Sequence, residues 1–407
     1  MCGARKYARE VFMISEKMRN MVKNSSAIRA MFEEGKKLAA VYGAENVYDF
    51  SLGNPNLPAP KEVAEALISE VENCDALTLH GYMSNAGFED VRQAVADSLN
   101  ARFGMNYDSS CIVMSVGAAG GLNVFLKAVL DMGDEVVVIA PFFGEYANYV
   151  SNYDGSLVVV PPNPPTFQPD ITEFRKALTA KTKAVIINTP NNPTGVVYGK
   201  ETLTALADAM RDAQKEYGTS IYLLSDEPYR ELVYGGAKQE YPAKYYENTV
   251  SGYSFSKSLS LAGERIGYLA VNPECADFDD LVGALGVATR VLGFVNAPSL
   301  IQRAAAKCLD ASVDVSYYEK NGAALKAIMD KCGFKYVEPE GAFYLFVKAP
   351  DGDDIKFSAE AKKQRLLLVP ATGFGCKGWV RIAYCVSPET IARSEQSFIK
   401  LSQTYGK

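Results

Sequence analysis

Short apolar runs alternate with helix-patterned segments through the middle of the chain, and this alternation constrains the fold more than any other feature. The runs are rich in β-branched residues and end in turn or polar residues, as strands do. Between two of them, residues 201–218 repeat apolar side chains at helical spacing and end in a glycine. Strands alternating with helices predict a mostly parallel, doubly wound α/β sheet. The predicted strands span residues 134–141, 157–162, 183–190, 220–228, 249–257 and 266–273.

Both ends of the chain differ from this central pattern. The helix-patterned "AIRAMFEEGKKLAAVYG" lies near the start, and the strand-like "GAFYLFVKAP" and "WVRIAYCVS" lie near the end. We therefore expect a smaller α+β domain built from residues 1–46 and 306–407, with a large domain over residues 47–305. The proline-rich "LGNPNLPAP" at 52–60 excludes a continuous helix or strand and predicts a hinge into the large domain.

Composition excludes several classes of protein. The chain has 407 residues, of which 48% are hydrophobic and 22% charged, as expected of a globular protein with more than one domain. A net charge of −6 gives no general attraction to nucleic acid or anionic membranes. No apolar run is long enough to span a bilayer, and the amino terminus lacks the apolar core of a signal peptide. We expect a cytoplasmic protein that binds small molecules.

The single histidine and the scattered cysteines argue against a metal site. His80 is the only histidine, so a histidine cluster is impossible and a Ser-His-Asp triad would depend on this one residue. The eight cysteines never form a C-x-x-C pair. We expect no bound metal, with acid and base chemistry carried by Lys, Tyr, Asp or Glu, or by a cofactor.

Reactive and polar residues follow the predicted strands, at the edge where doubly wound sheets bind ligands. Lys257 in "SFSK", with Arg265 nearby, would be a nucleophile for carbonyl compounds if burial lowered its pKa. The "GAAGG" segment at 117–121 would expose backbone N–H groups to a phosphate, although tight helix packing explains its small residues equally well. Together with Asp226 and an aromatic ring of "PFFGEY", these features match the needs of pyridoxal phosphate.

At this point the sequence resembles the class I and II aminotransferases of pyridoxal phosphate fold type I, the family of aspartate aminotransferase. The lysine motif "SFSKSLSLAGERIG" matches the family signature at every constrained position. The segments "NTPNNPTG", "SDEPYRELVY" and "WVRIAY" occur where the other family motifs do, and in the same order. The resemblance covers essentially the whole chain.

The resemblance implies a role for each matching residue. Lys257 would form the internal aldimine with the cofactor and then carry the proton to and from the substrate α-carbon in a ping-pong cycle. Asp226 would keep the pyridine nitrogen protonated, and Asn192 and Tyr229 would hydrogen-bond the phenolic oxygen. The phosphate and ring would be held by Gly117, Ala118, Ala119, Phe143, Ser254, Arg265 and, from the neighbouring subunit of a homodimer, Tyr82.

The same resemblance implies that Arg381, Asn192 and Gly53 bind the substrate. Arg381 would hold the α-carboxylate in a bidentate pair, and Gly53 would let the backbone approach the same group. From the sequence alone, Arg381 could instead pair with an internal carboxylate.

Three questions about residues near the predicted cofactor site stay open. Phe142 or Tyr146 could replace Phe143 as the ring contact. Ala118 and Ala119 stand where many relatives carry a polar side chain. Tyr146 stands where some relatives have a histidine beside the aspartate.

Substrate specificity stays open at this level. The resemblance implies an L-amino acid donor, such as aspartate or an aromatic amino acid, and a 2-oxo acid acceptor such as 2-oxoglutarate. Arg290 lies near the region from which some relatives extend an arginine to a second carboxylate, although an exposed surface residue is the simpler interpretation. A carbon–sulfur β-lyase of the same fold is the main alternative function. A non-catalytic ligand-sensing domain is less favoured, because the chain lacks a basic DNA-binding module.

Overall fold

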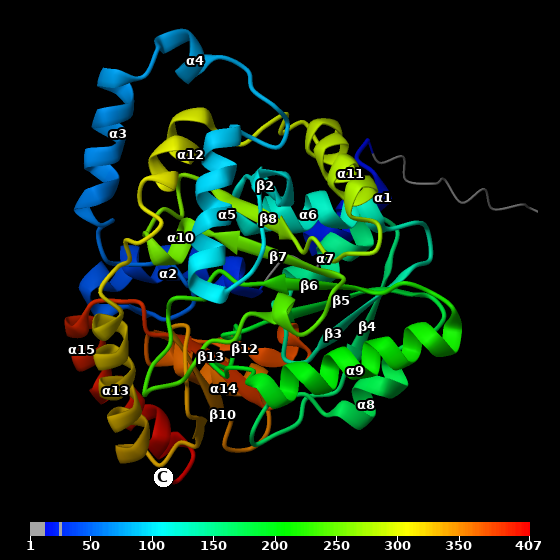
Figure 1. Ribbon diagram of the computed structural model, residues 1–407. Coiled ribbons are helices and arrows are strands. Elements are labelled where there is room, and N and C mark those ends of the chain that lie inside the picture. Colours follow the sequence, from blue (N-terminus) through cyan, green and yellow to red (C-terminus); the bar gives the residue numbers. More distant parts are fainter. Residues whose placement is uncertain (1–12, 24–26) are drawn as a thin grey trace, which may run out of the picture.

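A seven-stranded sheet forms the centre of the molecule (Figure 1), in a computed structural model that describes residues 13–23 and 27–407. Its strands, in spatial order, are β2 (Ile112–Ser115), β8 (Gly267–Val271), β7 (Thr249–Ser254), β6 (Tyr222–Asp226), β5 (Thr182–Asn188), β3 (Glu135–Ile139) and β4 (Ser156–Val160). Only β8 runs antiparallel to its neighbours. The predicted mostly parallel α/β sheet is confirmed.

Successive side chains of the central strands pack into hydrophobic clusters on opposite faces of this sheet. Val137 and Val185 belong to one cluster, and Val136 and Ala184 belong to another. Burial on both faces explains why the sequence shows continuous apolar runs where half-exposed strands would alternate. The first cluster includes α8 (Ile171–Ala177) and α9 (Lys200–Tyr217), and the second includes α6 (Gly117–Val129), α7 (Glu145–Asn152) and α11 (Phe278–Val291).

Further helices cover the β2 edge of the sheet, where a third cluster contains Val91, Ile112 and Ile301. These helices are α3 (Lys61–Asn73), α4 (Ala76–His80), α5 (Glu89–Phe103), α10 (Phe255–Ser258) and α12 (Ser299–Ala306). Short 3₁₀ helices connect elements elsewhere, at Ala44–Asn46, Ser109–Cys111, Pro242–Lys244 and Ala371–Phe374.

The C-terminal part of the chain forms a second, antiparallel sheet with its own helices. In spatial order its strands are β12 (Val369–Pro370), β13 (Trp379–Ala383), β10 (Tyr344–Lys348) and β9 (Tyr336–Val337). The helices here are α13 (Val315–Lys331), α14 (Asp354–Lys363) and α15 (Pro388–Thr404).

Two N-terminal elements, α2 (Ala27–Tyr42) and β1 (Tyr48–Asp49), join this C-terminal part. Helix α1 (Glu16–Lys23) lies elsewhere, and its Lys17 forms an ion pair with Asp154 between α7 and β4. Strand β1 pairs in parallel with β11 (Leu366–Leu367), and α2 contacts β12. Residues 27–49 therefore meet the C-terminal part in space, while the boundaries predicted at 46/47 and 305/306 stay predictions.

The strand predicted for 249–257 is shorter than expected, and this changes where Lys257 lies. Strand β7 ends at Ser254, whose Oγ accepts a hydrogen bond from the backbone N–H of Ser256 at 3.2 Å. This cap starts the one-turn helix α10. Lys257 therefore projects from a short helix just beyond the strand, and the prediction that the strand reaches residue 257 was wrong.

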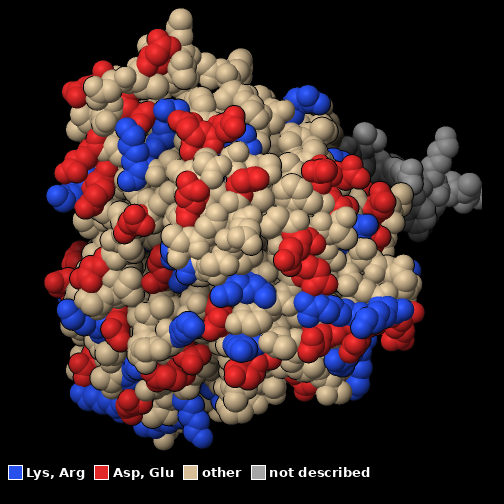
Figure 2. All heavy atoms as spheres, viewed as in Figure 1, with Lys and Arg blue, Asp and Glu red and all other residues tan. Residues whose placement is uncertain are grey.

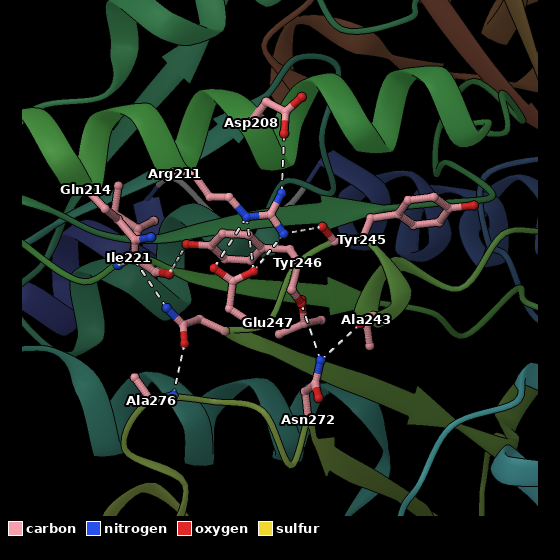
Figure 3. Close-up of polar contacts among 12 residues, drawn as sticks. Asp208, Arg211, Gln214, Ile221, Ala243, Tyr245, Tyr246, Glu247, Asn272 and Ala276 are labelled. Atoms are coloured by element: carbon pink, nitrogen blue, oxygen red, sulfur yellow. Dashed lines mark hydrogen bonds and ion pairs between the residues drawn. The ribbon is translucent and has the colours of Figure 1, made fainter.

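A hydrogen-bonded cluster anchors the opposite end of β7 (Figure 3). Arg211 of α9 donates to Glu247 and to the carbonyl oxygen of Tyr245, both at 2.7 Å. The Tyr246 hydroxyl donates to the carbonyl oxygen of Ile221 at 2.7 Å, immediately before β6. These contacts join the segment that enters β7 to α9 and to the neighbouring strand, so the position of β7 is fixed far from the ligand-binding edge.

On the face that Figure 2 shows, Lys and Arg side chains are interspersed with Asp and Glu side chains. None of the helices in the described ranges is long and apolar enough to cross a membrane. Within residues 13–23 and 27–407, no group of three or more His, Cys, Asp or Glu residues is arranged to hold a metal ion.

Candidate active site

A cavity of about 730 Å³ opens where the predicted site residues converge. It lies beyond the carboxyl ends of β5, β6 and β7, between the large sheet and the C-terminal sheet. The predicted residues that line it are Gly53, Ala118, Ala119, Phe143, Asn192, Asp226, Tyr229, Ser254, Lys257, Arg265 and Arg381.

Lys257 reaches into the cavity from α10. Its Nζ donates a hydrogen bond to the carbonyl oxygen of Gly53 at 2.6 Å and lies 5.5 Å from the centre of the Phe343 ring. Burial lowers the pKa of Lys257 to about 8, and the positive charges of Arg381 and Arg265 act in the same direction. The side chain is therefore an amine with a substantial neutral fraction near physiological pH, as a nucleophile requires.

Small residues and an arginine form an anion-binding corner beside this lysine. Gly117 starts α6 with a positive φ of 69°, and a Cβ atom at this position would lie 2.7 Å from Nη2 of Arg265. Only glycine combines this backbone conformation with so close an approach. Ala118 and Ala119 continue the helix without bulky side chains, and they line the cavity, as suits an anion at a helix N-terminus.

Asp226 ends β6 at the base of the cavity with one oxygen unpartnered. Its Oδ2 accepts a hydrogen bond from the Tyr146 hydroxyl at 2.6 Å, whereas its buried Oδ1 has no partner among the described residues. Burial raises the pKa of Asp226 to about 7, and the Tyr146 hydrogen bond opposes that rise. A buried carboxyl oxygen without a partner fits a ligand that brings a hydrogen-bond donor.

Arg381 is a buried cation without a buried anion. Only 1% of the residue is exposed, its Nη1 donates to Asn192 Oδ1 at 3.0 Å, and its Nε has no hydrogen-bond partner. The guanidinium lies 4.5 Å from the centre of the Tyr344 ring. Among the described residues no carboxylate forms an ion pair with Arg381, so the structure does not support pairing with an internal carboxylate. An acidic ligand would supply the missing charge.

Tyr344 connects the remaining polar groups. Its hydroxyl forms a hydrogen bond of 2.8 Å with that of Tyr229. A Cβ on Gly53 would lie 2.0 Å from the Tyr344 hydroxyl oxygen, so a side chain at position 53 cannot be accommodated. The glycine therefore lets its backbone line the cavity beside Arg381.

Comparison with known proteins fits this geometry. The sequence model of the family "Aminotransferase class I and II" matches residues 45–396. The protein is a class I and II aminotransferase. It is 32% identical to the aspartate aminotransferase of Thermotoga maritima over 90% of this chain and 94% of that protein. It is 30% identical to aromatic-amino-acid aminotransferase 2 of Thermococcus litoralis over 90% of this chain and 93% of that one.

Solved structures agree with this assignment. A crystal structure of an aminotransferase from Eubacterium rectale matches with a TM-score of 0.95 and 43% identity, over 98% of this chain and 100% of that one. Aspartate aminotransferase from Thermus thermophilus with maleate matches with a TM-score of 0.86 and 27% identity, over 96% of this chain and 100% of that one. The resemblance to the aspartate-aminotransferase fold is confirmed.

In this aminotransferase, the open questions about aromatic residues have structural answers. Phe143 lines the cavity, whereas Phe142 packs in the hydrophobic core. Tyr146 is buried, and its hydroxyl donates a hydrogen bond to Asp226. Phe143 is thus the one of the three that is free to contact a ligand ring.

Three predicted residues lie outside the cavity lining. Gly117 is one, although a Cβ at its position would lie 2.7 Å from Nη2 of Arg265, which does line the cavity. Tyr82 is 93% exposed, and Arg290 is exposed on α11. A single chain of the aminotransferase does not bring Tyr82 or Arg290 to the site.

Several residues that line the cavity of the aminotransferase were not among those predicted from the sequence. Tyr344 stands in an apolar strand with no local signal, and its role depends on pairing between β10 and β13. Glu33 and Lys36 sit in a charged helical segment that resembles any solvated helix surface. Tyr149 follows Tyr146 by about one helical turn, a spacing that would have placed both on one face.

Proposed function

We propose that this aminotransferase moves the amino group of an L-amino acid to a 2-oxo acid such as 2-oxoglutarate in a ping-pong cycle centred on Lys257. One observation carries the proposal: the cavity holds both a buried amine with a lowered pKa and the buried, unpaired guanidinium of Arg381. The amine suits reaction with a carbonyl, and the guanidinium suits an α-carboxylate. The relatives named above for aspartate and for aromatic amino acids support such substrates.

The residues present fit pyridoxal phosphate. The Oδ1 atom of Asp226 is buried and unpartnered, as a contact to a protonated ring nitrogen requires. Bound there, the cofactor would supply an electron sink for the bond that breaks at the substrate α-carbon. Gly117, Ala118, Ala119, Ser254 and Arg265 would hold the phosphate, Phe143 would cover the ring, and Asn192 and Tyr229 would hydrogen-bond the phenolic oxygen.

Lys257 and Arg381 would have different roles toward the substrate. Arg381, with Asn192 and the Gly53 backbone, would fix the α-carboxylate and so place the α-carbon. With a pKa of about 8, roughly one Lys257 side chain in ten is neutral at pH 7. Its Nζ would hold the cofactor in the cavity and would also move the proton at the substrate α-carbon.

The same proposal includes a homodimer, in which Tyr82 of each chain would reach the phosphate bound by its partner. Large apolar residues are exposed on α4, on α11 and on the segments beside them. Hydrogen bonds from Asn85 to the carbonyl oxygen of Val295 and from Ser299 to that of Leu79 hold these segments together. These exposed apolar side chains favour contact with a second chain. A cytoplasmic location remains part of the proposal.

An absorbance titration tests the proposed reaction. The cofactor-loaded protein would be mixed with single amino acids in the absence of any 2-oxo acid, with aspartate and glutamate first. We expect the visible band of the lysine-bound cofactor to convert stoichiometrically to the amine form, and the Lys257→Ala variant to fold without that band. Pyruvate and ammonia released from cysteine-type substrates, with the band unchanged, would show the carbon–sulfur lyase instead.

A further inference from the structure

We propose that the Tyr253 hydroxyl is a positioning group, which holds Lys257 in place relative to Asp226 by joining the two chain segments that carry them. The bridge consists of two side-chain hydrogen bonds that lie outside the cavity lining. This inference deepens the proposed function and rests on it for the roles of Lys257 and Asp226.

The segments that follow β6 and β7 each supply residues to the cavity and residues that lie outside it. After β6, Asp226 lines the cavity, whereas Arg230 does not. At the end of β7, Lys257 lines the cavity, whereas Tyr253 does not. Arg230 and Tyr253 instead pack on each other, with the guanidinium carbon 4.5 Å from the centre of the ring. The two segments are therefore in contact outside the cavity that their reactive groups share.

The Tyr253 hydroxyl links these segments by hydrogen bonds. It lies 2.9 Å from Glu231 Oε2 and 2.7 Å from Ser258 Oγ. An ionised carboxylate can only accept, so the Tyr253 hydroxyl donates to Glu231 and accepts from the Ser258 hydroxyl. Glu231 belongs to the turn after Asp226, and Ser258 is the residue after Lys257. One hydroxyl thus joins the turn beyond β6 to helix α10.

This bridge is buried and fixed at its far end. Arg102 of α5 donates to Glu231 Oε1 at 3.0 Å, and the Glu231 side chain is 13% exposed. Tyr253 and Ser258 are 4% and 2% exposed, so water competes little for their hydrogen bonds. Because the Tyr253 ring also packs on Arg230, its hydroxyl has a defined place between the two segments.

Helix α10 needs such contacts because it is a single turn of four residues. A helix so short is not stable by itself, so its orientation depends on its neighbours. The backbone N–H of Val313 donates to the carbonyl oxygen of Ser258 at 2.8 Å, which holds the end of the turn without the side-chain bridge. We therefore expect loss of the bridge to loosen α10 and to let water reach Lys257, while the protein still folds.

Two substitutions remove the bridge from opposite ends. Tyr253→Phe keeps the ring on Arg230 and removes only the hydroxyl, and Ser258→Ala removes the group that donates to it. Tyr107→Phe is the matched control. Tyr107 is 3% exposed and belongs to the same hydrophobic cluster, but its hydroxyl bonds at 3.1 Å to that of Tyr241, not to a residue of α10.

The first measurement is the pH profile of Lys257 methylation by formaldehyde and cyanoborohydride in the cofactor-free protein, followed by mass spectrometry. Burial lowers the pKa of Lys257 to about 8; the Cys385 thiol opposes this effect, and the charges of Arg381 and Arg265 add to it. The variants leave these three groups in place. A rise in the midpoint of the profile would therefore show that the amine is less buried.

We expect Tyr253→Phe and Ser258→Ala to raise this midpoint by about half a pH unit to one pH unit, and Tyr107→Phe to leave it at the wild-type value. In the cofactor-loaded protein, the first two variants should bind pyridoxal phosphate about fivefold more weakly. Their visible circular dichroism per bound cofactor should also fall, because the ring is held less firmly between Lys257 and Asp226.

A double variant tests whether the bridge itself is responsible. Since Tyr253→Phe and Ser258→Ala remove the same hydrogen bond, we expect the double variant to shift the midpoint no further than Tyr253→Phe alone. Two results would overturn the proposal: a Tyr253→Phe profile that matches that of Tyr107→Phe, or a double variant whose shift is the sum of the single shifts.

The methylation profile does not depend on turnover or on bound cofactor. If the midpoint shifts as expected and yet no amino acid changes the cofactor spectrum, the proposed reaction fails while the role of Tyr253 in holding Lys257 stands.

Discussion

At the scale of single residues, this aminotransferase keeps two buried ionisable groups without opposite charges beside them. Arg381 contacts amide and carbonyl oxygens, and Asp226 receives one phenolic hydrogen bond. Burial of a charge is costly unless an opposite charge is present. The cost is consistent with a site built for a ligand that carries both an acidic and a basic group.

The cost of burying the charged form of Asp226 should appear in the pH dependence of the free energy of unfolding. In the protein without cofactor, burial raises the pKa of Asp226 to about 7 from the 3.8 of an exposed aspartate. The unfolded chain therefore loses this proton near pH 4 and the folded chain only near pH 7. The Asp226 side chain thus disfavours folding progressively as the pH rises between these values.

We expect Asp226→Asn, which cannot titrate, to gain about 3 kcal/mol of stability relative to the wild type between pH 5 and pH 8. Urea unfolding of both cofactor-free proteins at the two pH values measures the difference. An equal stability difference at pH 5 and pH 8 would contradict the raised pKa.

At the scale of elements, buried strands could be predicted from the sequence, whereas an element boundary that depends on a side-chain hydrogen bond could not. The strands around Val137 and Val185 were predictable because burial on both faces demands apolar runs. The end of β7 was not, because Ser254 can continue a strand or cap a helix equally well. Lys257, Asp226 and Arg381 belong to recognisable motifs. The place of Tyr344 in the cavity depends on chain segments that meet only in the folded protein.

The hydrogen-bonded cluster at the start of β7 predicts a variant that is less stable but keeps its function. Asn248, which is 5% exposed, accepts a hydrogen bond from the Ala276 N–H at 3.1 Å and donates to Gln214 at 3.2 Å. Asn248→Ala would remove both hydrogen bonds, so we expect it to lower the free energy of unfolding by about 1–3 kcal/mol. Urea unfolding measures the loss, with the exposed Asn73→Ala as a near-neutral control. A changed cofactor spectrum would show that the anchor also positions Lys257.

At the scale of the whole molecule, the exposed apolar residues predict how two chains meet. Val291 of α11 is 61% exposed in a single chain and would lie in the proposed dimer interface. A charge there would be buried without a partner. We therefore expect Val291→Glu to be monomeric at micromolar concentration and to bind the cofactor more weakly, because Tyr82 of the partner is lost.

Sedimentation velocity and cofactor titration measure both effects. Met132→Glu is the matched control, since Met132 is 87% exposed but lies between α6 and β3, away from that surface. A Val291→Glu protein that stays dimeric would place the interface elsewhere.

The single antiparallel strand has a mechanical consequence. Because β8 runs against β7, Ser254, Lys257 and Arg265 all lie on one hairpin that the large sheet holds at both ends. Arg381 lies instead on β13 of the C-terminal sheet. The amine and the anion-binding corner thus form one rigid unit and the guanidinium belongs to another. Any rotation between the two units would change the distance from Lys257 to a carboxylate held by Arg381. It would leave Ser254, Lys257 and Arg265 in place relative to one another.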